Sequence, residues 1–242
     1  MLKRILLISV LVMNIIACST TTPSTDPHDP YEHYNRSIFA MNAVGDRLLV
    51  RPIATVYTKL VPDPVQTGVH NAYQNVGELS VIPNDILQGK PMFLLSDCFR
   101  FIINSTVGVL GWFDVAKHMN LPYHPEDFGM TLAYWEGSTQ PTYFMVPLLG
   151  PNDVRGGIGI PFDYIMSPVH YYLNTNQQMV FYAGKYISMR ADYLAADSMV
   201  EQSFDPYAFI RGFYMAHREQ QLRDNTLTFA QYLKEQQQPD GA

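Results

Sequence analysis

Apolar side chains recur every three or four residues along most of the chain, which is the spacing of one face of an α-helix. They predict a first helix that stops near Pro52, a second helix that begins near residue 65, and a long late helix. The positions that define these three faces are Ile38, Met41, Gly45 and Leu48; Val65, Val69, Tyr73 and Val76; and Met179, Ala183, Ile187, Ala191 and Leu194. Strand-like alternation is confined to short stretches such as 142–147. We therefore predict a mainly α-helical, single-domain fold with few short strands.

Residues 92–113 are apolar except for a narrow line of polar and small residues. This line, which we call the polar seam, consists of Asp97, Arg100, Asn104, Gly108 and Gly111. Its steps of three and four residues place it on one stripe of a helix. Charged side chains are costly at the centre of a bilayer, so the segment is not predicted to be a simple membrane span.

Three interpretations of this segment are open from its residues alone. The helix is the core of a globular domain with Asp97 and Arg100 paired, or it covers a ligand pocket, or it turns its apolar sides to lipid and the polar seam to a passage. Glycine has no Cβ, so Gly108 and Gly111 either allow close backbone approach or leave space along the seam.

The composition narrows the class of protein. The chain has 242 residues, a net charge of −6, and 47% hydrophobic but only 16% charged residues. Proteins that bind nucleic acid by neutralising phosphates carry an excess of positive charge, so no nucleic-acid partner is expected. With 13 Phe, 16 Tyr and 2 Trp, the chain is too aromatic for a disordered protein. An enzyme with large buried surfaces fits this composition, and so does a protein whose apolar surface contacts lipid or a partner.

The N-terminus has the features of an export signal. Two basic residues precede an apolar stretch that is too short for a stable membrane-spanning helix. The stretch ends at Ala17-Cys18, which resembles the lipobox of bacterial lipoproteins; the alternative is a plain secretory signal with an incidental cysteine. Because the signal, the small Ala17 and the cysteine coincide at the right spacing, we predict a signal peptide over residues 1–17 and lipidation of Cys18. Several acyl chains would then anchor the protein stably. By the same resemblance, Ser19 points to the outer membrane.

Composition also suggests how the rest of the chain is divided. Residues 18–30 are polar and interrupted by prolines, which predicts a lipidated tether. Residues 31–217 are dense in apolar side chains and are predicted to form one helical domain, followed by a polar C-terminal tail over 218–242. With Cys18 lipidated, Cys98 has no cysteine partner, so no disulfide is expected.

The chain shows no recognised catalytic or cofactor motif. A nucleophile elbow, a phosphate-binding glycine loop and a zinc-protease helix motif are all absent from the sequence. His118 and His124 lie six residues apart in a proline-rich stretch, which is not a convincing metal-ligand spacing. Glu126 and Asp127 would suit acid–base chemistry, but adjacent carboxylates are ordinary at a surface or a helix cap. We therefore predict no catalytic residue, no cofactor and no metal site.

Motifs spread over nearly the whole chain resemble the MlaA (VacJ) family of lipoproteins. The matching stretches are residues 29–36, 51–54, 68–71, 87–89, 100–106, 111–116, 127–132 and 205–207. Single motif positions that carry the resemblance are Asn35, Arg36, Asn42, Arg51, Pro52, Gly129 and Arg155. Taken together these motifs are specific, although none of them would be so alone.

The resemblance implies a fold and a function. Members of the family form a ring of amphipathic helices with a central amphipathic channel in the inner leaflet of the Gram-negative outer membrane, and they associate with trimeric porins. They remove mislocalised glycerophospholipids from the outer leaflet and pass them to a soluble periplasmic carrier of the MlaC kind. The resemblance favours a lipid-facing helix over residues 92–113, with the polar seam lining the passage. Arg100 would meet a lipid phosphate or pair with Asp97.

Two alternative functions fit parts of the sequence. One is an envelope-anchored hydrolase that acts on lipid or peptidoglycan, and the other is a structural lipoprotein that scaffolds porins without moving lipid. Hydrolysis products from purified protein and phospholipid would identify the hydrolase, whereas intact transferred lipid would identify the transporter.

Overall fold

The computed structural model of the chain describes residues 26–237. The predicted signal peptide 1–17, the lipidation site Cys18 and most of the predicted tether 18–30 lie outside the described residues and stay predictions. Helices predominate in the described part, and its strands are two short antiparallel ones, β1 and β2. The mainly α-helical fold class is therefore confirmed.

Helices of very different lengths follow one another along the chain, with one short hairpin between them. In chain order the elements are α2 (Glu32–Gly45), the π-helical turn η1 (Asp46–Val50), α3 (Arg51–Leu60), α4 (Asp63–Gln88), α5 (Pro91–Thr106), α6 (Val115–His118), α7 (Phe128–Glu136), β1 (Tyr143–Val146), β2 (Gly150–Asp153), α8 (Val154–Met166), α9 (Pro168–Tyr172), α10 (Thr175–Asp192), the 3-10 turn η2 (Leu194–Ala196), α11 (Asp197–Gln202), α12 (Pro206–Asp224) and α13 (Phe229–Gln237).

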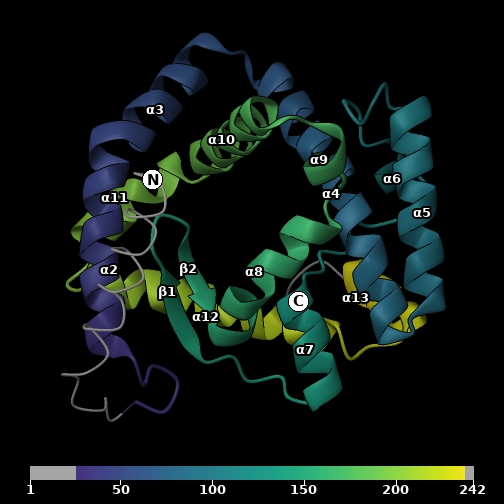
Figure 1. The fold of residues 1–242 in the computed structure, drawn as a ribbon. Helices are drawn as coiled ribbons and strands as arrows, with labels where there is room; N and C mark the ends of the chain where they lie inside the picture. The colour runs from purple at the N-terminus through teal and green to yellow at the C-terminus, as the bar shows by residue number, and fades with distance from the viewer. Residues whose placement is uncertain (1–25, 238–242) are drawn as a thin grey trace.

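The elements are arranged around a ring (Figure 1). Helix α2 continues through η1 into α3, α3 packs on α10, and α10 contacts α4. Helix α4 contacts α8, α8 contacts β1, and β1 packs against α2, which closes the circle. Helix α5 packs on α4 on the side away from the centre of the ring, and α12 contacts β2 and α7. The ring-like arrangement of helices expected from the resemblance is thus present.

The first predicted helix does not stop near Pro52. Helices α2 and α3 are joined by η1 without a break, so the chain is helical from Glu32 to Leu60. Pro52 lies in the first turn of α3, just after the π-helical turn. Because a π-helical turn relaxes the regular hydrogen-bond ladder, the missing N–H of the proline is tolerated there.

The helix predicted over residues 92–113 is too long at its C-terminal end. Helix α5 ends at Thr106. Residues 109–111 have φ angles of 54°, 58° and 85°, which an α-helix does not allow. The chain therefore turns after α5, and Gly108 and Gly111 leave the helical stripe on which their spacing placed them.

The predicted boundary between domain and tail at residue 217 falls inside α12, which continues to Asp224. Helix α13 then packs back on the body through Tyr232, which is only 3% exposed. The Tyr232 hydroxyl donates a hydrogen bond to the backbone carbonyl of Tyr123 at 2.8 Å. Within the described residues, the packed domain therefore extends to Gln237.

The apolar core is small and divided into separate clusters. One cluster consists of Tyr143, Met145, Tyr207 and Met215, and another of Met130, Ala133 and Leu222. Among the described residues, more polar and charged side chains are buried than apolar ones. Since buried polar groups must be paired, hydrogen bonds and ion pairs between elements hold much of the ring together.

Helices α7 and α8 pack with their backbones in close contact. The contact is made by Gly129 in α7 and Gly156 in α8, where a Cβ built on Gly129 would lie 2.5 Å from the Cα of Gly156. Residues 156–159 belong to the first half of α8 although three of them are glycines. The glycines provide the room for this contact, because neither helix carries a side chain at the crossing.

Gly129→Ala is expected to destabilise the protein by about 1–3 kcal/mol, because the added methyl group forces α7 and α8 apart. The matched control is Gly77→Ala in α4, where an added Cβ meets nothing within 4 Å. This control is expected to be neutral or stabilising by about 0.5–1 kcal/mol. Denaturant unfolding in detergent micelles measures both changes, and equal effects of the two substitutions would contradict the close packing of α7 on α8.

Candidate functional site

Helix α5 is amphipathic in the opposite sense from a helix on the surface of a soluble protein. Its outward face is apolar over Met92, Leu95, Phe99 and Ile102, which are 50–54% exposed, and ends at the exposed Thr106. Its buried face is mainly polar and consists of Phe93, Ser96, Asp97, Arg100 and Asn104. A soluble surface helix would turn the polar face to water. The structure therefore agrees with the interpretation in which the apolar sides of this helix face outward.

The exposed apolar surface extends to other elements. Exposed apolar residues after α5 are Val107, Val109, Leu110 and Phe113, and those along α2, η1 and α3 are Met41, Val44, Leu48, Leu49, Ile53, Val56 and Leu60. Exposed apolar groups in such runs mark surfaces that contact lipid or a partner. Over residues 26–237, the structure contains no helix with both the length and the apolar character needed to cross a membrane.

Arg100 is the centre of a buried polar network beneath this surface. Its side chain is 1% exposed, and its Nε donates a hydrogen bond to Glu78 Oε1 at 2.7 Å. Its Nη2 lies 3.3 Å from Asp114 Oδ2, and its Nη1 donates to the backbone carbonyl of Leu121. Burial raises the pKa of Glu78, and the hydrogen bond from Arg100 opposes that rise. Arg100 thereby joins α4, α5 and the chain on either side of α6.

Asn104 extends this network by one turn of α5. Its Nδ2 donates to Asp114 Oδ1 at 2.9 Å, and its Oδ1 accepts a hydrogen bond from the backbone N–H of Ala116 at 2.9 Å. The two glycines of the polar seam serve close packing. A Cβ on Gly111 would lie 2.4 Å from Asn75 Cβ, and a Cβ on Gly108 would lie 2.2 Å from a backbone oxygen. Of the two roles predicted for these glycines, the structure shows close backbone approach.

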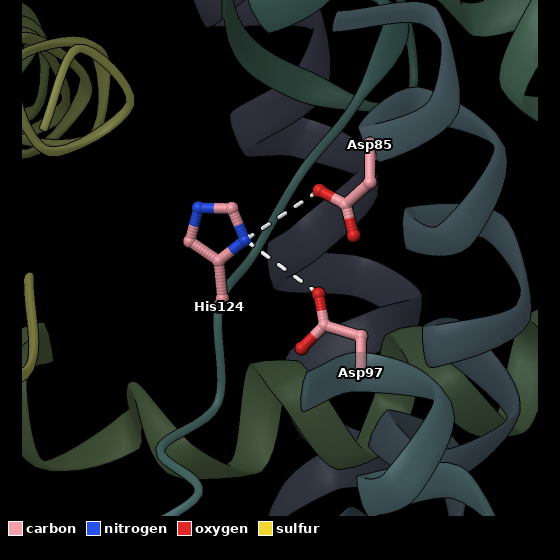
Figure 2. Close-up of side chains that lie close together, drawn as sticks. All are labelled: Asp85, Asp97 and His124. Atoms are coloured by element: carbon pink, nitrogen blue, oxygen red, sulfur yellow. Dashed lines mark ion pairs between the residues drawn. The ribbon is translucent and has the colours of Figure 1, made fainter. Parts of the chain in front are cut away.

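Three further buried side chains converge one turn of α5 from Arg100 (Figure 2). His124 Nδ1 lies 4.0 Å from Asp85 Oδ1 and 3.7 Å from Asp97 Oδ2. Burial, reinforced by the charge of Asp97, raises the pKa of Asp85 to about 9. Burial likewise raises the pKa of Asp97 to about 8 and lowers that of His124 to about 4. The cluster was not predicted from the sequence, because its members are far apart in the chain and share no motif.

Glu126 links this cluster to the end of α4. His124 Nε2 lies 3.5 Å from Glu126 Oε1, and Lys90 Nζ lies 3.4 Å from the same oxygen. Gln88 Nε2 donates to Glu126 Oε2 at 2.9 Å. The neighbouring Asp127 has a separate structural role, because its side chain caps α7. The two adjacent carboxylates therefore point to different partners.

The polar seam thus lies inside the protein. Asp97, Arg100 and Asn104 are at most 3% exposed and contact other protein groups. Arg100 pairs with Glu78 and Asp114, and within residues 26–237 it forms no ion pair with Asp97. That the seam lines a passage for lipid stays a prediction.

A polar groove borders the network around Arg100. Its volume is about 660 Å³, and it is lined by the first half of α4, the segment 113–123 and Gln236 near the end of α13. Asp114 and Tyr123 belong both to this wall and to the surroundings of Arg100, whose guanidinium lies 5.6 Å from the Tyr123 ring centre. Basic groups on the wall are Lys117 and the histidines His70 and His118.

Two of the family-motif asparagines attach α2 to the β-hairpin. The fully buried Asn35 donates to Asp29 Oδ1 at 2.7 Å and accepts a hydrogen bond from the backbone N–H of Met145 at 2.8 Å. Two turns further along α2, Asn42 donates to the carbonyl of Val146 at 3.0 Å and accepts from the backbone just after β1 at 2.8 Å. Both amides satisfy backbone groups at the closure of the ring.

The motif arginines join elements that are distant in sequence. Arg36 of α2 pairs with Asp205 at 2.7 Å at the start of α12, and Arg51 of α3 pairs with Glu201 at 2.5 Å in α11. Arg155 of α8 pairs with a glutamate at the end of α7 at 2.8 Å. Together with Pro52 and Gly129, these residues maintain the ring and lie outside the network around Arg100.

A helical ring with an apolar outer surface and a polar interior defines a protein that is suited to lie against lipid or an apolar partner. The chain belongs to the MlaA lipoprotein family, whose model matches residues 27–221. The resemblance found in the sequence motifs is therefore confirmed.

Individual relatives agree with this assignment. A protein of Rickettsia bellii (strain RML369-C) is 32% identical over 210 residues, which cover 86% of this chain and 82% of that protein. The Escherichia coli (strain K12) protein named intermembrane phospholipid transport system lipoprotein MlaA is 30% identical over 210 residues, covering 85% and 83% of the two chains. A solved structure, described as the structural basis for maintenance of bacterial outer membrane lipid asymmetry, matches with a TM-score of 0.68 and 29% identity over 80% of this chain and 98% of that chain.

Arg100→Met is expected to destabilise the protein by about 3–5 kcal/mol, because it leaves the Glu78 carboxylate buried without its cation. Adding Glu78→Gln to Arg100→Met is expected to recover part of this loss. The control Arg223→Met removes an exposed pair with Glu219, whose atoms are 3.7 Å apart, and should change stability by about 0.5 kcal/mol or less. Unfolding free energies in micelles provide the measurement, and an effect of Arg100→Met as small as that of the control would refute the role given to Arg100.

Proposed function

We propose that this lipoprotein removes mislocalised glycerophospholipids from the outer leaflet of the outer membrane and passes them to a periplasmic carrier. The observation that carries the proposal is the reversed polarity of α5, with apolar side chains outward and polar side chains inward, in a ring of helices. The name of the E. coli relative and the subject of the similar solved structure support the same conclusion.

The physical requirement is the movement of a charged head group past hydrocarbon. A phospholipid can leave its leaflet only if its acyl chains stay in apolar surroundings while its phosphate stays hydrogen-bonded or hydrated, since burying an unpaired charge is costly. A ring that is apolar outside and polar inside lowers this cost without breaking a covalent bond. We therefore infer a transport function without catalysis, in which the acceptor sets the direction of flow.

The location follows from the anchor and the apolar surface. Acyl chains on Cys18 and the exposed apolar faces of α2, α3 and α5 would both enter the periplasmic leaflet of the outer membrane. In this position the protein lies in one leaflet, next to trimeric porins, and opens towards a soluble carrier of the MlaC kind. The porin and the carrier are partners that the family resemblance implies.

The polar groove is the proposed entrance for the lipid head group. Lys117 offers the positive charge that a phosphate requires, and His70 and His118 offer N–H groups that can donate hydrogen bonds to it. The polar seam, namely Asp97, Arg100, Asn104, Gly108 and Gly111, lies behind one wall of the groove. For these residues to line the passage, segment 113–123 must move away from α5 during transport.

Deletion of the gene is expected to raise the amount of phospholipid in the outer leaflet and the sensitivity of the cells to detergent. Restoring the wild-type gene should reverse both effects, whereas Cys18→Ala should not, because the unanchored protein is lost from the membrane. Surface labelling of phospholipid measures the first effect. Unchanged outer-leaflet phospholipid in the deletion strain would refute the proposal, and hydrolysis of phospholipid by the purified protein would favour a hydrolase instead.

Lys117→Glu is expected to reduce lipid transfer from vesicles to the carrier several-fold, because it places negative charge where the phosphate enters. Arg223→Glu makes the same change of charge at an exposed position of α12 that does not line the groove, and it should leave transfer unchanged. Equal expression and equal melting temperatures of the two variants serve as controls. If both variants transfer lipid at the wild-type rate, the head group takes another route.

A further inference from the structure

The cluster of Asp85, Asp97 and His124 brings three potential metal ligands to one point (Figure 2). The ligands come from α4, from α5 and from the segment between α6 and α7. One ligand atom from each residue lies within 4.8 Å of the others, and the two distances to His124 Nδ1 are 4.0 Å and 3.7 Å. Ligand atoms bound tetrahedrally to Zn²⁺ lie about 3.4 Å apart, so small side-chain rotations would let one ion bind all three.

The ligand atoms of this cluster lack hydrogen-bond partners although they are buried. Asp85 and Asp97 are 0% exposed and His124 is 3% exposed. Within the described part of the chain, these oxygens and nitrogens have no hydrogen-bond partner outside the cluster, and the carboxyl groups of Asp85 and Asp97 face each other closely enough to share a proton. Buried polar atoms are nearly always paired, with protein, water or an ion. Three such atoms, one from each residue, meet at one point, which indicates that a further group belongs there.

The nearby cations are committed to other partners. Lys90 contacts Glu126 at 3.4 Å and the backbone carbonyl of Asn225 at 2.6 Å. Arg100 contacts Glu78 and Asp114, as described above. Two buried carboxylates, Asp85 and Asp97, therefore remain with no lysine or arginine within ion-pair distance among residues 26–237. A single divalent cation would balance both charges.

We propose that Asp85, Asp97 and His124 bind one divalent transition-metal ion, with Zn²⁺ as the ion that best matches the ligands. Two carboxylate oxygens and one imidazole nitrogen are ligands that zinc accepts. Mg²⁺ and Ca²⁺ prefer oxygen ligands throughout, so the imidazole selects against them. The site is buried and offers three protein ligands, so a water molecule or the second oxygen of one carboxylate would complete a tetrahedral set.

The surroundings of His124 orient it for this role. Its Nε2 faces Glu126 Oε1 at 3.5 Å, and Glu126 is held in turn by Gln88 at 2.9 Å. A carboxylate that faces one ring nitrogen favours the proton on that nitrogen, which leaves the lone pair of the other nitrogen for a metal. The ring of Phe93, whose centre lies 4.3 Å from that of His124, packs against the imidazole. A bound ion would fasten the segment before α7 to the pair α4–α5.

The test uses the full-length lipidated protein, purified in detergent without a histidine tag. After treatment with a chelator, it is titrated with ZnCl₂ by calorimetry, with MgCl₂ and CaCl₂ in parallel. We expect about one Zn²⁺ per chain, a rise of several degrees in melting temperature, and no comparable effect of Mg²⁺ or Ca²⁺. Asp97→Asn and His124→Gln should each weaken Zn²⁺ binding by at least about tenfold.

His70→Gln is the matched control, because His70 forms a similar but exposed pair with Asp192 at 3.0 Å. It should leave Zn²⁺ affinity unchanged. Asp97→Asn removes a buried charge, so it is expected to fold, and its melting temperature without metal verifies this. The proposal is overturned if the wild-type protein binds no Zn²⁺, if Asp97→Asn and His124→Gln bind it as tightly as the wild type, or if Mg²⁺ binds equally well. Absence of binding together with a more stable Asp97→Asn would show instead that the two carboxylates share a proton.

Discussion

The buried ion pair between Arg100 of α5 and Glu78 of α4 joins these two helices. Helix α5 turns most of its apolar side chains away from α4. In a water-soluble domain such a pair contributes little net stability, because desolvation of both charges offsets their attraction. Here the apolar side chains of α5 face outward, so burial of hydrocarbon between α4 and α5 cannot supply the attraction. Polar contacts and the close packing of small residues hold the two helices together instead, as they do between helices in a membrane. Asn104 and Asp114 extend the same arrangement to the chain around α6.

The rest of the ring is held together in the same way. Asn35 and Asn42 attach α2 to the hairpin through backbone hydrogen bonds, and Arg36 and Arg51 connect α2 and α3 to the C-terminal helices. Between α7 and α8, glycine lets the backbones meet directly. Most of these contacts join elements that are far apart in the sequence. The family motifs are therefore explained mainly by closure of the ring rather than by contact with lipid.

The segment between α5 and α7 contributes both to the polar groove and to the proposed metal site. It leaves α5 through residues with positive φ, forms a wall of the polar groove, and carries His124 back to α4 and α5. Its outer residues belong to the exposed apolar surface, whereas its inner residues contact Arg100. A metal ion at His124 would restrain one end of this segment while leaving the wall of the groove beside α6 able to move. The proposed passage and the proposed metal site thus act on the same part of the chain.

The helical class, the short strand near residue 143 and the reversed polarity of residues 92–106 were determined by local sequence, because periodicity and side-chain polarity are set residue by residue. The helix ends predicted from the same local pattern were wrong at Pro52 and beyond Thr106. A π-helical turn at the first place and positive φ angles at the second depend on the surrounding contacts. Tertiary structure alone decided the partner of Arg100, which is Glu78 rather than the nearby Asp97. It also decided the meeting of Asp85, Asp97 and His124. Such contacts depend on how α4, α5 and the following loop are folded together, and no spacing in a single sequence records that arrangement.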